Sequence, residues 1–345
     1  MTNQHEITKR MPLLNREGNL TEPGWARGLL WDYHRPDIRA SGMRIKEWDY
    51  YFVSNGHIGL ALTIADNGYM GLDSVSYLDF DEKWEITKSP MRLLPMGKTA
   101  LPETSAAGAS EIARGGYALA FYHDDDGTRK LTFHMDKFRG KDAIEGMISL
   151  SDEPAESMVI ATPFGKAGHF YYNQKINCMR ASGWIELGGA RVELDPKTWF
   201  AVLDWGRGVW TYHNTWYWGS ASGEVDGVPF GWNIGYGFGD TSAASENVLF
   251  YGGKIHKLSQ VRFEIPMQDG KEDYLAPWRF SSDDGRFEMA FAPILNRAAC
   301  TSVGVIKSDQ NQVFGRFTGT AALDDGTVLQ VKDFFGFAEK VENKW

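Results

Sequence analysis

Hydrophobic and polar residues alternate in short segments along almost the whole chain, whereas helical periodicity is scarce. Alternation at every second residue, with β-branched and aromatic side chains between Gly, Asp and Asn, is typical of half-buried strands. The pattern predicts strands over residues 48–54, 58–65, 117–123, 130–135, 146–150, 157–162, 184–187, 199–204, 248–251, 261–265, 287–292, 313–323 and 328–331. The chain is therefore predicted to be all-β.

Turn residues and chain length indicate how these strands are arranged. The runs 124–127 and 324–326, rich in Asp and ending in Gly, predict tight hairpin turns, and the small polar residues of 100–113 predict a loop. A chain of 345 residues exceeds the usual size of one core. Closed barrels leave no open sheet edges, so we expect two antiparallel β-barrels in tandem, in residues 1–170 and 171–345. One large β domain is the competing arrangement.

Composition and charge narrow the class of protein. A content of 43% hydrophobic and 23% charged residues indicates a globular fold. The net charge of −9 is opposite to the basic surface that a nucleic-acid-binding protein needs. No stretch approaches the roughly 18 apolar residues of a membrane helix, and the N-terminus lacks the apolar core of a signal peptide. We expect a cytoplasmic protein without a nucleic-acid partner or a membrane span, and the sequence leaves the oligomeric state open.

The sequence contains no motif that requires a cofactor or a metal. Cys178 and Cys300 are far apart and form no CxxC pair. HExxH and GxSxG motifs are absent, and no two histidines have the spacing of metal ligands. The glycine-rich runs 97–99 and 235–239 lack the spacing of phosphate-binding or dinucleotide-binding loops. The sequence therefore predicts chemistry carried by side chains alone.

Aromatic side chains gather between residues 199 and 232, where indoles are interleaved with polar groups. A packed core and a pocket wall explain the aromatic side chains equally well, but polar groups among indoles favour a ligand site. A small apolar molecule is the predicted ligand. The candidate substrate-binding residues in this part of the chain are Trp210, His213, Asn214, Trp216, Trp218, Trp232 and Asn233.

Three further residues are candidate catalytic groups. Asp204 ends an apolar strand, so it would lose hydration and could donate a proton as a general acid. Arg207 follows three residues later, and an ion pair between the two would instead give Asp204 a structural role. Tyr212 would orient substrate or water.

A second cluster of charged and aromatic residues lies in a predicted strand nearer the N-terminus. Glu47 and Asp49 should share one face of this strand with Tyr51, because successive side chains alternate between faces. They would bind substrate if that face lines the barrel interior. Ordinary alternation on a face turned to water is the competing explanation.

Several segments resemble a known family. WARGLLWDYHR, RIKEWDYYFV, LDWGRGVWTYHNTWYW, SENVLFYGGKIHKL and VFGRFTGTA resemble the DUF2804 family. The order HFYYNQ, ASGWIEL, LDWGRG and WYW is more distantly similar to carotenoid 1,2-hydratase and AttH-like tandem lipocalin proteins. This resemblance implies two lipocalin-like barrels and matches Asp204 to the acid of the hydratases. The sequence departs from those hydratases at Trp205 and Gly206, where they typically have His and Glu.

Three hypotheses about function follow. The first is a cofactor-independent lyase of the hydratase type, or an isomerase, that acts on an isoprenoid-like or polyketide-like molecule. Asp204 would be its general acid, and Trp210, Trp216 and Trp218 would stabilise positive charge. The second is a non-catalytic carrier or sensor of a hydrophobic ligand. The third is a carbohydrate-active enzyme, in which Asp204 and either Glu47 or Asp49 would face each other across a groove.

Overall fold

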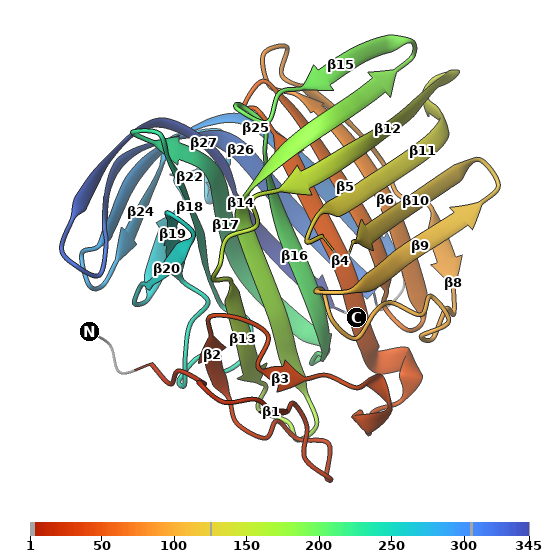
Figure 1. Ribbon diagram of the computed structural model, residues 1–345, viewed down its shortest axis with the longest axis vertical. Helices are drawn as coiled ribbons and strands as arrows, with labels where there is room; N and C mark the ends of the chain where they lie inside the picture. The colour runs from red at the N-terminus through yellow and green to blue at the C-terminus, as the bar shows by residue number, and fades with distance from the viewer. Residues whose placement is uncertain (1–3, 125, 304–305, 345) are drawn as a thin grey trace.

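The structure is a computed structural model that describes residues 4–124, 126–303 and 306–344. Two large, strongly curled antiparallel sheets lie side by side (Figure 1), which confirms the all-β prediction. The short 3-10 helices are η1 (Arg35–Asp37) and η2 (Gly42–Arg44). Among the described residues, no helix has the length and apolarity needed to cross a membrane.

The first sheet has 14 strands, and ten of them follow one path in the order β7-β6-β5-β4-β16-β14-β12-β11-β10-β9. Strands β2, β8, β13 and β15 pair beside this path. The bounds are β2 (Gly24–Ala26), β4 (Ile45–Ser54), β5 (Ile58–Asp66), β6 (Met70–Asp79), β7 (Trp84–Lys88), β8 (Met91–Leu93), β9 (Gly108–Arg114), β10 (Tyr117–His123), β11 (Arg129–Arg139), β12 (Asp142–Ser151), β13 (Met158–Pro163), β14 (Phe170–Leu187), β15 (Ala190–Leu194) and β16 (Phe200–Val209).

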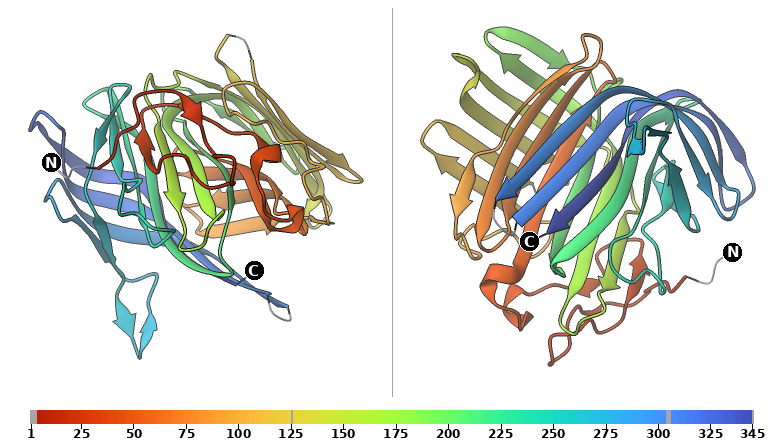
Figure 2. Two further views of the ribbon diagram at one scale, coloured as in Figure 1. Left: turned by 90° about the horizontal axis from the view of Figure 1, so that it is seen from below. Right: turned by 180° about the vertical axis from the view of Figure 1, so that it is seen from behind.

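The second sheet has nine strands in the order β20-β19-β18-β17-β27-β26-β25-β24-β21. Its strands are β17 (His213–Val225), β18 (Val228–Tyr236), β19 (Val248–Tyr251), β20 (Lys254–Lys257), β21 (Val261–Glu264), β24 (Trp278–Ser282), β25 (Phe287–Val303), β26 (Ile306–Ala322) and β27 (Val328–Lys344). Two small sheets pair β1 (Met11–Pro12) with β3 (Trp31–Asp32) and β22 (Met267–Gln268) with β23 (Lys271–Glu272). The segment with β1 to β3 covers one end of the molecule (Figure 2).

The expected pair of closed barrels is not confirmed. Among the described residues, the hydrogen-bonded path of the first sheet runs from β7 to β9 and that of the second from β20 to β21, so both sheets are curled but open. β14 and β16 lie in the middle of the first sheet. The chain therefore changes sheet between Val209 and His213, whereas the predicted domain boundary was residue 170.

Strand positions agree well with the alternation pattern, and β10 and β19 match their predicted ranges. The hairpin predicted at 324–326 connects β26 to β27, with Gly326 at a φ of +89°. The segment 100–113 was expected to be a loop, but its last residues belong to β9. Residue 125 of the hairpin predicted at 124–127 lies outside the described residues.

The three central strands of the first sheet are buried on both faces. Side chains such as Tyr51, Tyr172 and Leu203 pack into the core of that sheet. The side chains on the opposite face of these strands, such as Phe52 and Val202, pack against Trp218 and Phe337 of the second sheet. The layer between the two sheets is therefore built from even-numbered residues of β4 and β16 and from odd-numbered residues of β14 up to Asn177, beyond which a bulge reverses the alternation.

Candidate functional site

A polar group lies in the apolar layer between the two sheets, and it is the candidate site. The side chain of Asp204 on β16 points into this layer and is 8% exposed. Its Oδ2 forms an ion pair of 2.9 Å with Lys175 Nζ, and its Oδ1 accepts a hydrogen bond of 2.6 Å from Asn173 Nδ2. Lys175 is opposite Asp204 in the register of β14 with β16. Lys175 and Asn173 thus hold both oxygens of Asp204 in place as hydrogen-bond acceptors.

The lysine connects Asp204 to the second sheet. Lys175 Nζ lies 3.9 Å from the centre of the Trp218 ring, a cation–π contact. Trp218 Nε1 donates to Asn233 Oδ1 at 2.7 Å, and Asn233 Nδ2 donates to the Glu246 carbonyl at 3.0 Å and to its Oε2 at 3.3 Å. Burial raises the pKa of Glu246, although Lys175 opposes this shift. A continuous chain of polar contacts therefore crosses the interface.

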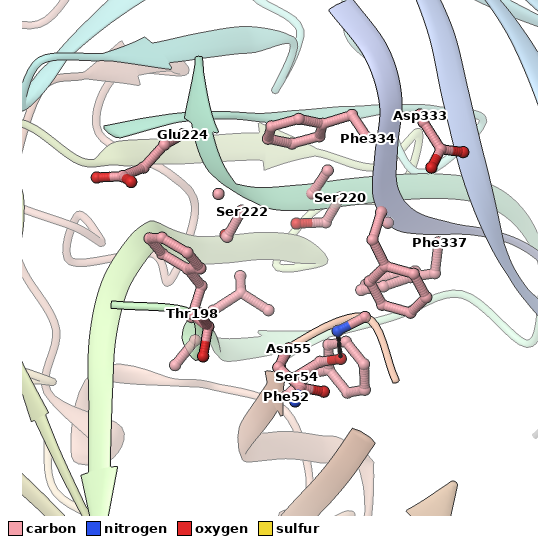
Figure 3. Close-up of a pocket in the computed structure, with 18 of the residues that line it drawn as sticks. Phe52, Ser54, Asn55, Thr198, Ser220, Ser222, Glu224, Asp333, Phe334 and Phe337 are labelled. Carbon is pink, nitrogen blue, oxygen red and sulfur yellow. Dashed lines mark hydrogen bonds between the residues drawn. The ribbon is translucent and has the colours of Figure 1, made fainter. Parts of the chain in front are cut away.

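A pocket of about 280 Å³ opens between the sheets beside this group. Figure 3 shows its walls: Phe52 and Ser54 come from β4, Ser220 and Ser222 from β17, and Phe337 from β27. The rings of Phe52 and Phe337 are 5.6 Å apart in a T-shaped arrangement. The lining is thus mixed, because two aromatic rings stand beside three serine side chains, and it can hold an apolar molecule and orient a polar group on it.

The polar group lies one step behind that wall on each strand. Val202, Ser220 and Phe337 line the pocket, and two residues further along the same strands are Asp204, Trp218 and Glu339. Residues two apart on a strand share a face and are about 7 Å apart. Phe337 belongs to both regions, since it lines the pocket and its ring also contacts Trp218, with 4.8 Å between the ring centres.

The ion pair between Asp204 and Arg207, which the sequence left open as an alternative, does not form. Arg207 is fully buried on the opposite face of β16, where its Nη1 is 3.0 Å from Asp49 Oδ1 and its Nε is 3.8 Å from Glu47 Oε1. Glu47 also accepts hydrogen bonds from Tyr33 and Arg35. The expectation that Glu47 and Asp49 share a face is met. This face is the core of the first sheet, so neither carboxylate faces Asp204 across a groove.

The candidates around the β16–β17 connection lie apart from Asp204. Tyr212 is exposed, and Asn214 is bonded within the turn through Thr211. His213 and Asn214 line a separate, open pocket of about 490 Å³, together with Tyr236. The structure thus does not bring these residues to the polar group.

The four predicted tryptophans have different surroundings. Trp218 belongs to the polar group, and Trp216 is next to it, since its Nε1 donates to Glu339 Oε1 at 3.0 Å. Trp210 packs edge-on against Trp216 and marks the end of the layer. Trp232 points the other way, into the core of the second sheet.

Lys175 and Glu339 were not predicted as site residues, and both come from strands outside the aromatic segment 199–232. A partial signal for Lys175 exists: Asn173, Lys175 and Asn177 stand at every second position of β14, although Gln174 between them is polar as well. Polar residues at every second position of a buried strand indicate a shared polar face. No comparable signal marks Glu339, because charged residues are common throughout β27.

No group of three or more His, Cys, Asp or Glu side chains among the described residues could hold a metal ion. The ionisable side chains between the sheets are the groups that can carry chemistry there. They can accept a proton, hold a positive charge or donate a hydrogen bond.

Comparison with protein families identifies the chain. The model of DUF2804, a domain of unknown function, matches residues 4–345. The chain belongs to the DUF2804 family. No functionally curated protein matches this DUF2804 chain.

Solved structures share the fold of this DUF2804 protein. An AttH-like protein from Nitrosomonas europaea is 14% identical, with a TM-score of 0.53 over 92% of this chain and 98% of its own. Kievitone hydratase from Nectria haematococca is 10% identical, with a TM-score of 0.55 over 97% of this chain and 98% of its own. These similarities extend over both sheets and establish the fold.

Proposed function

We propose that this DUF2804 protein is a cofactor-independent enzyme of the hydratase or isomerase type that acts on an apolar small molecule between the two sheets. One observation carries the proposal: the Lys175–Asp204 ion pair is buried one row of residues behind a pocket between the two sheets. Buried charges cost free energy, so such a pair next to a pocket is a candidate for proton transfer. The fold shared with kievitone hydratase is consistent with this function.

The structure changes the role that we give to Asp204. Its two donors, Lys175 and Asn173, favour a carboxylate that accepts a proton or stabilises positive charge in the substrate. Lys175 occupies one face of Trp218, so this indole is less available to a cationic intermediate. A cytoplasmic location and the division into two domains stay predictions.

The test replaces both residues of the ion pair with uncharged residues of similar size. Replacement of Asp204 alone would leave Lys175 buried without its counter-ion, at a cost of about 3 kcal/mol, so Lys175→Gln and Asp204→Asn are combined. The protein is incubated with geraniol, linalool and farnesol in H₂¹⁸O and in D₂O, and mass spectrometry measures the isotope gained. We expect turnover by the wild type and a loss of at least about 100-fold in the double variant.

A matched control replaces an exposed pair of the same kind. Lys130 and Asp124 form an ion pair at the surface, and the variant Lys130→Gln/Asp124→Asn should keep wild-type turnover. Equal turnover by the wild type and the Lys175→Gln/Asp204→Asn variant would remove the ion pair from the chemistry.

A carrier of a hydrophobic ligand is the second candidate. The observation that favours it is the Lys175–Asp204 pair itself, because each charge already has a partner inside the protein. Native mass spectrometry of the purified protein distinguishes the two functions. A co-purified apolar molecule that leaves chemically unchanged, together with no isotope uptake in the panel, would favour the carrier.

A further inference from the structure

Glu339 on β27 is a buried carboxyl group to which the function proposed above gives no role. Only 4% of its surface is exposed. Its Oε1 accepts from Trp216 Nε1 at 3.0 Å, and its Oε2 accepts from Gln312 Nε2 at 3.1 Å and, more weakly, from Gln310 Nε2 at 3.5 Å. All three donors are neutral. Glu339 thus differs from Asp204, which has an ammonium group as its partner.

The register of the second sheet places Glu339 beside the polar group. Glu339 is opposite Trp218 in the pairing of β17 with β27, and Phe337 is opposite Ser220. Phe337 and Ser220 line the pocket, so Glu339 and Trp218 form the next row inward. Glu339 therefore faces the interface from the second sheet, as Asp204 does from the first.

The surroundings let Glu339 keep its proton up to nearly neutral pH. Burial raises its pKa from the ordinary value of 4.5 to about 7. The Trp216 hydrogen bond, Arg297 from β25 and Lys175 from β14 oppose this shift, and the carboxylate of Asp204 supports it. The phenols of Tyr50 and Tyr171 also face this region, and burial keeps both of them neutral by raising their pKa. A carboxylic acid that titrates near pH 7 is well matched to donate a proton.

Buried polar atoms with few partners surround the same place. In the described part of the chain, Asn173 Oδ1 is buried without a hydrogen-bond partner, and Tyr50 Oη and Gln312 Oε1 are buried with no partner other than each other's side chain. Each belongs to a residue that contacts this site: Asn173 bonds Asp204, Gln312 bonds Glu339, and the ring of Tyr50 is 5.9 Å from that of Trp218. Buried polar atoms are normally satisfied. Two acceptors and a hydroxyl suit a hydroxyl group or a water molecule.

We propose that Glu339 is the proton donor of this site and that these buried polar atoms hold the water or hydroxyl group that reacts. This inference rests on the function proposed above. In hydration, the O–H bond of Glu339 breaks and a C–H bond forms at one carbon of a substrate double bond. Water forms a C–O bond at the other carbon and releases a proton to Asp204. Return of that proton to Glu339 through solvent completes the cycle, so one alkene and one water give one alcohol.

Glu339→Gln tests the proposal with little change of shape. Its carbonyl can still accept from Trp216, and Gln312 can turn its amide so that its Oε1 accepts from the new NH₂ group. With whichever of geraniol, linalool and farnesol the wild type converts, we expect kcat to fall at least about 100-fold. In the wild type, kcat should fall above about pH 7, where Glu339 loses its proton. The residual kcat of the variant should not fall in this pH range.

The matched controls are two other glutamates. Glu342 is on the same strand but is only half-buried, with 45% of its side chain exposed, so Glu342→Gln should behave as the wild type. Burial also raises the pKa of Glu246, so Glu246→Gln tests whether Glu246 is the proton donor instead of Glu339. Loss of turnover in Glu246→Gln with full turnover in Glu339→Gln would overturn the proposal.

Infrared difference spectroscopy between about pH 5.5 and pH 8.5 detects the proton without a substrate. We expect the carbonyl band of a protonated carboxylic acid at the lower pH in the wild type and in Glu342→Gln, and its loss in Glu339→Gln. An unchanged band in Glu339→Gln would overturn the proposal.

If Glu339→Gln stays active while Lys175→Gln/Asp204→Asn does not, Glu339 is not the donor and the proposed function stands. If the wild type converts no compound, the proposed function fails, and the band alone decides whether Glu339 holds the proton.

Discussion

At the scale of residues, strand alternation decides which charges meet. Asp204 and Arg207 are three positions apart on β16, and an odd spacing puts two side chains on opposite faces. The predicted strand ended at residue 204, whereas β16 continues to Val209. Had the predicted strand included residue 207, the odd spacing would have excluded a direct pair from the sequence alone. The true partner, Lys175, comes from another strand, and only the register of β14 with β16 identifies it.

Glu339 makes the stability of the protein depend on pH with a definite sign. The unfolded chain releases this proton near pH 4.5, whereas the folded protein keeps it until about pH 7. The folded state thus binds more protons in this window, so raising the pH from about 4.5 to about 7 lowers the free energy of unfolding. The difference between the two pKa values corresponds to at most roughly 3 kcal/mol.

Urea unfolding of the wild type and Glu339→Gln at several pH values measures this effect. Glutamine does not titrate, so the stability of the wild type relative to the variant should decline across the window and level off above it. Two curves that stay parallel would show that Glu339 has an ordinary pKa in the folded protein.

At the scale of elements, close approach between strands and indoles shapes the layer between the sheets. A Cβ atom added to Gly206 on β16 would lie 1.9 Å from Cζ2 of Trp48 on β4. The six-membered ring of Trp48 therefore lies directly on the backbone of β16. Trp48 stacks in turn on Tyr171 at 6.1 Å and contacts Trp210 edge-on at 5.3 Å. The glycine next to Trp205 is required by packing, which explains one departure from the hydratase pattern.

Gly206→Ala should lower the stability of the protein by about 1 to 3 kcal/mol, because Trp48 must leave its position. Tryptophan fluorescence should change as well, since the stack with Tyr171 is broken. Gly115→Ala is the control, as nothing lies within 4 Å of the added Cβ atom there. A Gly206→Ala protein as stable as the control would contradict this account of the packing.

At the scale of the whole molecule, alternation was enough to predict an all-β protein but not the sheet to which each strand belongs. β14 is an 18-residue strand in which residues 170–179 are all buried, because the first core covers one face and the second sheet covers the other. A strand buried on both sides lacks the regular alternation of polar and apolar residues that marks a half-buried strand. The prediction therefore recognised only its last residues, 184–187, and placed the division of the chain in front of it.

This arrangement predicts which fragment can fold. A fragment of residues 1–170 lacks β14 and β16, which join β4 to β12 in the first sheet, so we expect it to be unfolded or insoluble. A fragment of residues 1–211 keeps every strand of that sheet and should show a β-sheet circular dichroism spectrum. A folded 1–170 fragment would support the boundary at residue 170 that the sequence predicts.

The pocket between the sheets has a mouth made of turns and an inner wall made of strands. Asn55 and Gly56 belong to the β4–β5 turn, and Thr198 lies in the connection before β16, whereas Val202 and Ser220 are held by strand pairing. Turns accept substitution and insertion far more readily than paired strands do. Selection could therefore alter which molecules enter by changing a few residues at the mouth while the ionisable groups stay in register. One reactive centre could in this way serve many different metabolites.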